Sequence, residues 1–109
     1  MASTREYLDY VLAQISDAGD ITHRPMMGEF VLYCDGKVVG GIYDNRLLLK
    51  PTQTALQILD AAGITPTMDI PYEGAKPMLA ADIDDGERTC RLIRAIANDL
   101  PSPKKKGSV

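Results

Sequence analysis

The sequence has few of the residues that build metal sites, disulfide frameworks and most catalytic centres. Its 109 residues include one histidine, two cysteines, one phenylalanine and no tryptophan. The two cysteines do not form a CxxC pair and are too few for the disulfide framework of a small secreted domain. A reducing compartment fits this usage, and the interior must be filled mostly by aliphatic side chains.

Long apolar runs are also missing. No apolar stretch approaches the roughly 20 residues of a membrane span. The first residues, MASTREYLDY, carry charges where a signal peptide needs an uninterrupted apolar region. We therefore expect a cytoplasmic protein without a membrane anchor.

Basic residues are in the minority over most of the chain. The formal net charge is −3, but three of the 12 Lys and Arg residues are Lys104, Lys105 and Lys106. The rest of the chain thus carries nine basic against 15 acidic side chains. Because a protein that holds a phosphate backbone usually has a basic surplus, nucleic-acid binding is not the favoured prediction, although the lysines could attract an anion locally.

The spacing of apolar residues predicts a single α+β domain. A chain of 109 residues has room for one core, and helical spacing alternates with short strand-like runs. The predicted order is a helix at about residues 5–18, strands at 21–24, 30–34, 37–43 and 46–50, a helix from Thr52 or Thr54 to Gly63, an irregular or edge-strand passage at 64–77, a strand at 78–82 and a helix from Asp84 to Leu100. This order, α-β(3–4)-α-β(1–2)-α, packs helices against an antiparallel β-meander. Residues 1–100 are expected to form the domain, and residues 101–109 a flexible basic tail.

Turn residues support the meander. Asp35-Gly36 between two apolar runs is a strong hairpin signal, and Asp44-Asn45 offers a second tight turn. Gly40-Gly41 lies inside a predicted strand, where it indicates a bulge or a close backbone approach.

Cap residues predict the helix boundaries. Ser3 with Glu6, and Asp84 with Glu87, have the spacing of capping boxes. Pro25 is expected to interrupt the first strand.

No catalytic or metal-binding pattern emerges from the remaining polar residues. His23 has no nearby nucleophile or orienting carboxylate, so a surface or turn histidine is favoured. The acidic residues Asp82, Asp84 and Asp85 lack the ligand spacing of a calcium loop. We predict no catalytic residues, no metal and no cofactor.

The two cysteines leave a redox role open. Cys90, with Arg91 and Arg94 near it, is the better candidate for a stabilised thiolate. Burial is the favoured interpretation for both cysteines, and Cys34 is expected to be an inert core thiol.

The last predicted helix carries the main basic feature. Arg88, Arg91 and Arg94 follow one another at spacings of three, and Lys104, Lys105 and Lys106 come after them. A solvated helix face is favoured over a patch for an anion, a nucleic acid or an acidic partner. No glycine-rich phosphate loop accompanies these residues.

The stretch PYEGAKPM, residues 71–78, is a candidate binding loop. No structural requirement explains why Tyr72, Lys76 and Met78 should stand together in it, and loops on a rigid scaffold are frequent binding sites. Alternatively, Tyr72 folds over the sheet as a small cover.

Several of these residues resemble a known family. MMGEFVLYCDGKVVGGIYDNRLLLKPT, followed by PYEGAKPM and a closing helix, resembles the TfoX/Sxy N-terminal domain of bacterial competence regulators and their stand-alone relatives. The resemblance implies helices packed on one antiparallel sheet, often in a homodimer, and protein-mediated regulation of transcription rather than catalysis. The chain departs from the pattern in two ways: Met27-Gly28-Glu29 replaces the more usual Phe-Gly-Gly, and we expect it to lack the second, helical domain of full-length regulators.

Three hypotheses follow. The first is a non-enzymatic regulatory module that meets a protein partner, or a second copy of itself, through its sheet and the 71–78 loop. The second is direct contact with nucleic acid through the arginine face and the lysine tail. The third is a small-molecule enzyme or a domain that binds a small ligand; an enzyme would need acid–base groups that the chain does not place together.

Overall fold

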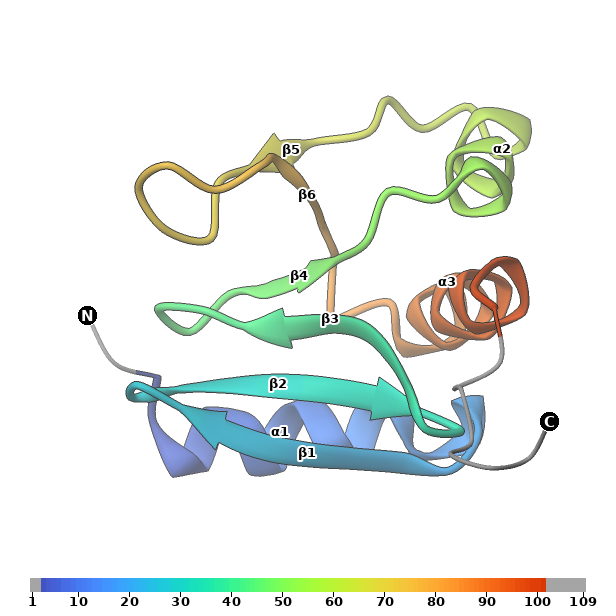
Figure 1. The fold of residues 1–109 in the computed structure, drawn as a ribbon. Coiled ribbons are helices and arrows are strands. Elements are labelled where there is room, and N and C mark those ends of the chain that lie inside the picture. The colour runs from blue at the N-terminus through green and yellow to red at the C-terminus, as the bar shows by residue number, and fades with distance from the viewer. Residues whose placement is uncertain (1–2, 102–109) are drawn as a thin grey trace, which may run out of the picture.

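The computed structural model describes residues 3–101 and has the predicted α+β architecture. Three α-helices pack against a six-stranded antiparallel sheet (Figure 1). The elements are α1 (Arg5–Ile15), a 3₁₀ turn (Ser16–Ala18), β1 (Ile21–Met26), β2 (Glu29–Cys34), β3 (Lys37–Ile42), β4 (Leu47–Leu49), α2 (Gln53–Ala61), β5 (Met68–Asp69), β6 (Met78–Ala80) and α3 (Gly86–Asp99). The predicted element order is confirmed, whereas the predicted tail falls almost wholly outside the described residues.

The sheet is a meander with one insertion. Its strands lie in the order β1-β2-β3-β4-β6-β5, and every neighbouring pair is antiparallel. The first four strands follow one another directly, and α2 separates them from the last two. The passage at 64–77 contributes only the two-residue edge strand β5, as its prolines predict.

Left-handed turns connect the meander. Asp35 and Gly36 have φ angles of 54° and 83°, and Asp44 and Asn45 have φ angles of 53° and 56°, as a type I′ hairpin turn requires. Both predicted turns are confirmed. A third turn of this kind, Met27-Gly28, joins β1 to β2, and its Met27 side chain is 98% exposed.

Pro25 does not interrupt the first strand, contrary to the prediction. β1 continues to Met26, and Pro25 pairs with Phe30 of β2. The strand tolerates a proline because β1 is the edge of the sheet, where a residue without an N–H can face away from the neighbouring strand.

Both capping predictions are displaced by one residue. The N-cap of α1 is Thr4, whose hydroxyl accepts a hydrogen bond from the Tyr7 backbone N–H at 3.1 Å. The N-cap of α3 is Asp85, which accepts one from the Arg88 N–H. The prediction was wrong for Ser3 because that side chain has other partners.

Hydrogen bonds of Ser3 link the beginning of α1 to two turns of the meander. Its hydroxyl donates to Glu29 Oε1 at 2.5 Å and accepts from the Asn45 N–H at 3.0 Å. Its own N–H donates to the Gly28 carbonyl, and the Thr4 N–H donates to Asn45 Oδ1. These bonds join the chain start to the β1–β2 and β3–β4 turns, which lie at the left end of Figure 1.

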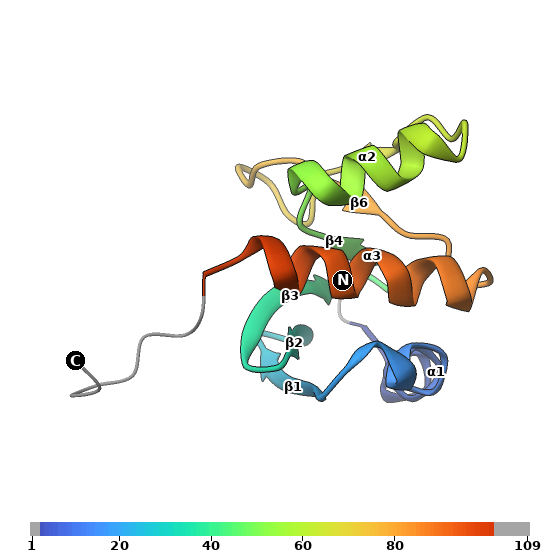
Figure 2. The same cartoon turned by 90° about the vertical axis from the view of Figure 1, so that its right-hand side faces the viewer.

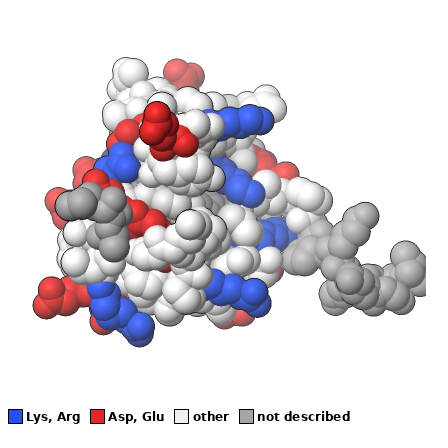
Figure 3. Space-filling model, turned by 60° about the vertical axis from the view of Figure 1, so that its left-hand side comes forward, with Lys and Arg blue, Asp and Glu red and all other residues white. Residues whose placement is uncertain are grey.

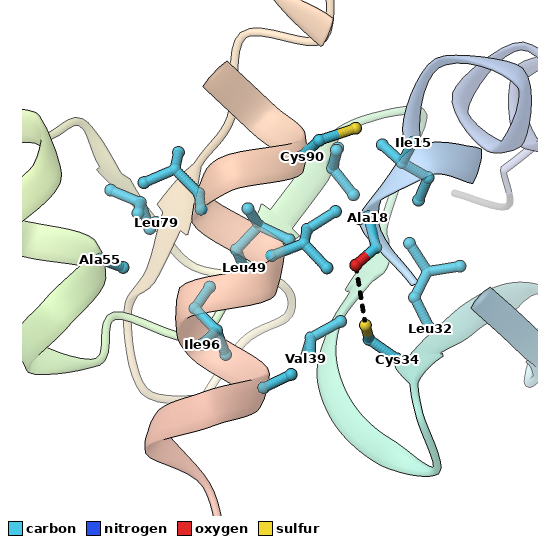
Figure 4. Close-up of a cluster of buried hydrophobic side chains, with 14 of the residues drawn as sticks. Ile15, Ala18, Leu32, Cys34, Val39, Leu49, Ala55, Leu79, Cys90 and Ile96 are labelled. Carbon is cyan, nitrogen blue, oxygen red and sulfur yellow. Dashed lines mark hydrogen bonds between the residues drawn. The ribbon is translucent and has the colours of Figure 1, made fainter. Parts of the chain in front are cut away.

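The hydrophobic core lies between the sheet and the helices. Side chains of α1, α3 and α2 meet one face of the strands, with residues such as Ile15, Ile96, Leu32 and Leu49 almost fully buried (Figure 4). Figure 2 shows α1 on one side of β1 and β2, while the segment between β5 and β6 lies on the opposite side of the sheet.

Gly40 and Gly41 let β3 approach its neighbours closely. A Cβ on Gly40 would overlap the Leu48 carbonyl oxygen, and one on Gly41 would lie 2.6 Å from the Phe30 carbonyl oxygen. The register between β2 and β3 also shifts beside them, between Leu32 and Tyr33. The close approach and the irregularity suggested by the glycine pair are confirmed.

We predict that Gly40→Ala lowers the free energy of unfolding by at least about 2 kcal/mol, because the added methyl meets backbone rather than a movable side chain. Urea unfolding at equilibrium measures the change. Gly74→Ala is the control: a methyl there meets nothing within 4 Å, so only the left-handed backbone contributes, about 1 kcal/mol. Equal losses in the two variants would contradict the close approach.

Ser3→Ala is expected to lower the free energy of unfolding by about 1 to 2 kcal/mol, because it leaves Glu29 Oε1 and the Asn45 N–H without their shared partner. Thermal unfolding checks the value. Ser16→Ala removes an exposed hydroxyl and should change stability by less than about 0.5 kcal/mol. A Ser3 variant as stable as the Ser16 variant would show that the bridge contributes nothing.

Candidate functional site

The candidate site lies on the face of the sheet that none of the described helices covers. Leu32 and Cys34 of β2 point into the core, so the alternate residues Val31 and Tyr33 point to the opposite, helix-free face. Both are only half-buried, and the Arg24 guanidinium lies 5.8 Å from the centre of the Tyr33 ring. This face is thus partly apolar and open near β1 and β2.

The helix-free face has its own cover near β4. Leu48 alternates with core residues and therefore points to this face, yet it is fully buried. The Tyr43 ring packs on Gly41, the cross-strand neighbour of Leu48; a Cβ on Gly41 would lie 2.7 Å from that ring. Tyr72 from the β5–β6 loop packs on Tyr43, with ring centres 6.2 Å apart and planes at 58°.

These aromatic rings border an open groove of about 420 Å³. It is lined by Tyr43, Lys50, Pro51, Pro71, Tyr72, Ala75, Lys76, Pro77 and Met78. The structure therefore brings together the predicted residues Tyr72, Lys76 and Met78. Tyr72 partly covers the sheet and still leaves 60% of its surface exposed, so the two interpretations of this residue are compatible.

Sequence reasoning missed Tyr43 and Lys50 as groove residues. Both stand in the meander, at the ends of strands rather than in the loop. A signal was present in the spacing Gly41-x-Tyr43, because a glycine two positions from an aromatic residue can accept its ring against the sheet. The partner ring, Tyr72, lies 29 positions away and could not be assigned from spacing.

Arg46 holds the β5–β6 loop against the end of β4. Its side chain donates hydrogen bonds to the Tyr43 carbonyl at 3.1 Å and to the Asp69 carboxylate. The Arg46 guanidinium lowers the pKa of Asp69 below its ordinary value, and the Ile70 N–H contributes in the same direction. The Asp69 carboxylate, which precedes the β5–β6 loop, is therefore already paired.

Lysines supply the charge within the groove. Lys50 is half-buried and Lys76 is exposed, and no acidic residue is among the lining residues. Within residues 3–101 neither ammonium group forms an ion pair. Burial, followed by the proximity of Tyr72 and Glu29, raises the pKa of Tyr43, so its phenol is neutral at physiological pH.

Figure 3 brings forward the end of the molecule that carries this loop. Uncharged atoms fill much of this view, acidic side chains stand in its upper and left-hand parts, and several Lys and Arg side chains stand along the right-hand side. Exposed apolar residues near the groove include Met68, Ile70 and Tyr72, with 44%, 49% and 60% of their surfaces exposed. Clustered exposure of this kind often marks an interaction surface.

The three arginines of α3 do not share one environment. Arg88 pairs with Asp85 and borders a hollow near the end of α2. Arg94 donates to the Asp17 carbonyl at 2.9 Å, and Arg91 is exposed. Acidic residues adjoin the hollows near Arg91 and Arg94, namely Asp17, Glu87 and Asp99. Lys104, Lys105 and Lys106 lie outside the described residues.

His23 and the cysteines have structural surroundings. His23 is half-buried in β1, and its ring packs edge-on against Phe30, with centres 6.1 Å apart. Cys34 and Cys90 are buried, and their Sγ atoms lie 3.8 Å from the Ala18 carbonyl and 3.4 Å from the Gln14 carbonyl. Burial raises the pKa of both thiols above the ordinary value.

The raised thiol pKa predicts slow alkylation of the folded chain at neutral pH, because thiolate is the reactive form and burial limits access to it. Iodoacetamide should modify either cysteine at least about tenfold more slowly in the native chain than in urea, with a rate that rises with pH as thiolate forms. The single variants Cys34→Ala and Cys90→Ala assign the rates. A thiol that reacts equally fast in both states would be a reactive cysteine after all.

The described residues lack two further features, a metal-binding cluster and a membrane-spanning helix. Residues 3–101 contain no group of three or more His, Cys, Asp or Glu side chains arranged to hold a metal ion. Over the same residues, no helix has the length and apolar character needed to cross a membrane.

Comparison with known proteins gives the family. The family model described as the TfoX N-terminal domain matches residues 13–94. The chain belongs to the TfoX N-terminal domain family. The matched range runs from α1 into α3, so the whole sheet and all the groove residues lie inside the domain that defines the family.

A relative has similar length. The chain is similar to a protein of Spirochaeta aurantia named as an uncharacterized 12.7 kDa protein in the trpE 5′ region. The two are 36% identical over 108 residues, which cover 97% of this chain and 90% of the relative. The similarity thus extends over nearly all of this chain and most of the relative.

Proposed function

We propose that this TfoX N-terminal domain protein is a non-enzymatic regulatory module that binds a protein partner through its helix-free face. The proposal is based on the groove. Its lining includes two aromatic rings, two lysines and three prolines, which come from the β3–β4 turn, the residues after β4 and the β5–β6 loop. Aromatic side chains are enriched at the centres of protein interfaces. The family suggests a role in transcriptional regulation, with competence as the related process, in the cytoplasm.

The environment of the polar residues supports binding rather than catalysis. The imidazole of His23 and the thiols of Cys34 and Cys90 lie in β1, β2 and α3, apart from the groove. The groove itself is lined by tyrosines and lysines, and its lining residues include no carboxylate or imidazole to take up a proton.

The environment of the α3 arginines favours protein over nucleic acid as the partner. Arg88 is paired, Arg94 is bonded to the backbone, and acidic side chains adjoin Arg91. A nucleic-acid interface gains affinity by neutralising many phosphates, and this surface offers few free cations among the described residues.

Site-specific photo-crosslinking tests the proposal. With p-benzoylphenylalanine in place of Tyr72, we expect one or a few protein adducts from the native cytosol, insensitive to nuclease, because this ring borders the groove and is 60% exposed. Mass spectrometry identifies the adducts, and light scattering of the purified chain shows whether the partner is a second copy.

Tyr10 is the matched control position. It is an exposed tyrosine, 42% accessible, on α1. The same adducts from both positions, or adducts at position 72 that vanish with nuclease, would contradict a protein-binding groove.

A further inference from the structure

We infer that the groove accepts a short, extended protein segment that combines acidic with apolar side chains. The inference rests on the proposed function and specifies the partner's chemistry. It is drawn from the lining of the groove, its charge, and the contacts that hold its walls.

The walls of the groove select for apolar contact. Pro51, Pro71 and Pro77 contribute rigid rings and no N–H donors, and Ala75 and Met78 add aliphatic surface. Tyr43 and Tyr72 supply aromatic faces on which an apolar side chain can rest. A volume of about 420 Å³ suits a few side chains rather than a folded domain.

The charged groups of the groove select for an acceptor. Lys50 and Lys76 carry donors only, and among the described residues neither has a carboxylate partner. Asp69 is paired with Arg46, and the exposed Glu73 of the β5–β6 loop is not among the lining residues. A segment with carboxylates spaced along it would therefore complement the two ammonium groups.

The charge of the whole chain argues for a peptide rather than a polyanion. Nine basic against 15 acidic side chains precede the lysine tail, so a long phosphate backbone would meet repulsion beyond the groove. A short acidic segment in the groove reaches less of that acidic surface than a long polyanion does.

The groove is already formed in the unbound chain. The Tyr43 ring packs on Gly41. Arg46 donates hydrogen bonds to the Tyr43 carbonyl and to Asp69, which precedes the β5–β6 loop. A segment that binds here orders little of the protein, which limits the entropic penalty of binding.

Titration of the ¹⁵N-labelled full chain with two capped peptides tests the inference. One peptide consists of Glu, Asp, Leu and Phe, and the other replaces each acid by Gln or Asn. We expect the acidic peptide to shift the amide signals of Tyr43, Lys50 and residues 72–78, and to bind roughly tenfold more tightly than the amide peptide.

Charge-removing variants sharpen the test. Lys50→Met combined with Lys76→Met keeps the aliphatic stems, so it should weaken the acidic peptide roughly tenfold and leave the amide peptide unchanged. Arg91→Met removes an exposed charge on α3 and should change neither affinity.

Each of the following outcomes would overturn the inference. The acidic and amide peptides bind equally, the shifts map to α3 instead of the groove, or a single-stranded oligothymidine binds the groove more tightly than the acidic peptide. If neither peptide binds but position 72 still crosslinks a protein, the inference fails while the proposed function stands.

Discussion

The close approach of β3 to its neighbours at Gly40 and Gly41 is the constraint on which the helix-free face depends. A side chain at Gly41 would meet both the Phe30 carbonyl oxygen and the Tyr43 ring. Without one, the Tyr43 ring packs on Gly41, the strand partner of the buried Leu48, and contacts the Tyr72 ring. The groove is therefore a consequence of two missing side chains in a strand.

The core face of the sheet is stabilised by hydrophobic packing, whereas the helix-free face presents the groove. The two faces of one sheet thus have separate roles. Helices α1, α2 and α3 bury aliphatic residues on the core face. The turns and the β5–β6 loop are held by hydrogen bonds instead. The Ser3 hydroxyl bonds to the β1–β2 and β3–β4 turns, and Arg46 holds the β5–β6 loop. A site held by short polar links on a packed scaffold can present exposed aromatic rings without needing a helix to cover them.

Local signals in the sequence were sufficient for the fold, and signals that depend on distant residues were not. Apolar spacing and the Asp35-Gly36 and Asp44-Asn45 turns predicted the meander because both act over a few residues. Ser3 was misread as a cap because its partners Glu29 and Asn45 lie 26 and 42 positions away. Pro25 fits a strand only once β1 is known to be the edge.

The candidate site was predicted in part for the same reason. Tyr72, Lys76 and Met78 stand together in one loop and drew attention as a group, whereas Tyr43 and Lys50 join them only through the pairing of β3 with β4. The arginines of α3 show the converse: their spacing was read correctly, but their partners Asp85 and Asp17 determine what they can bind.

Proton NMR of the unbound chain detects whether Tyr43 packs between Gly41 and Tyr72 in the free protein. We expect nuclear Overhauser contacts between the two tyrosine rings, together with an upfield ring-current shift of the Gly41 Hα protons. Gly41 protons at ordinary shifts, with no contact between the rings, would mean that the groove is not preformed.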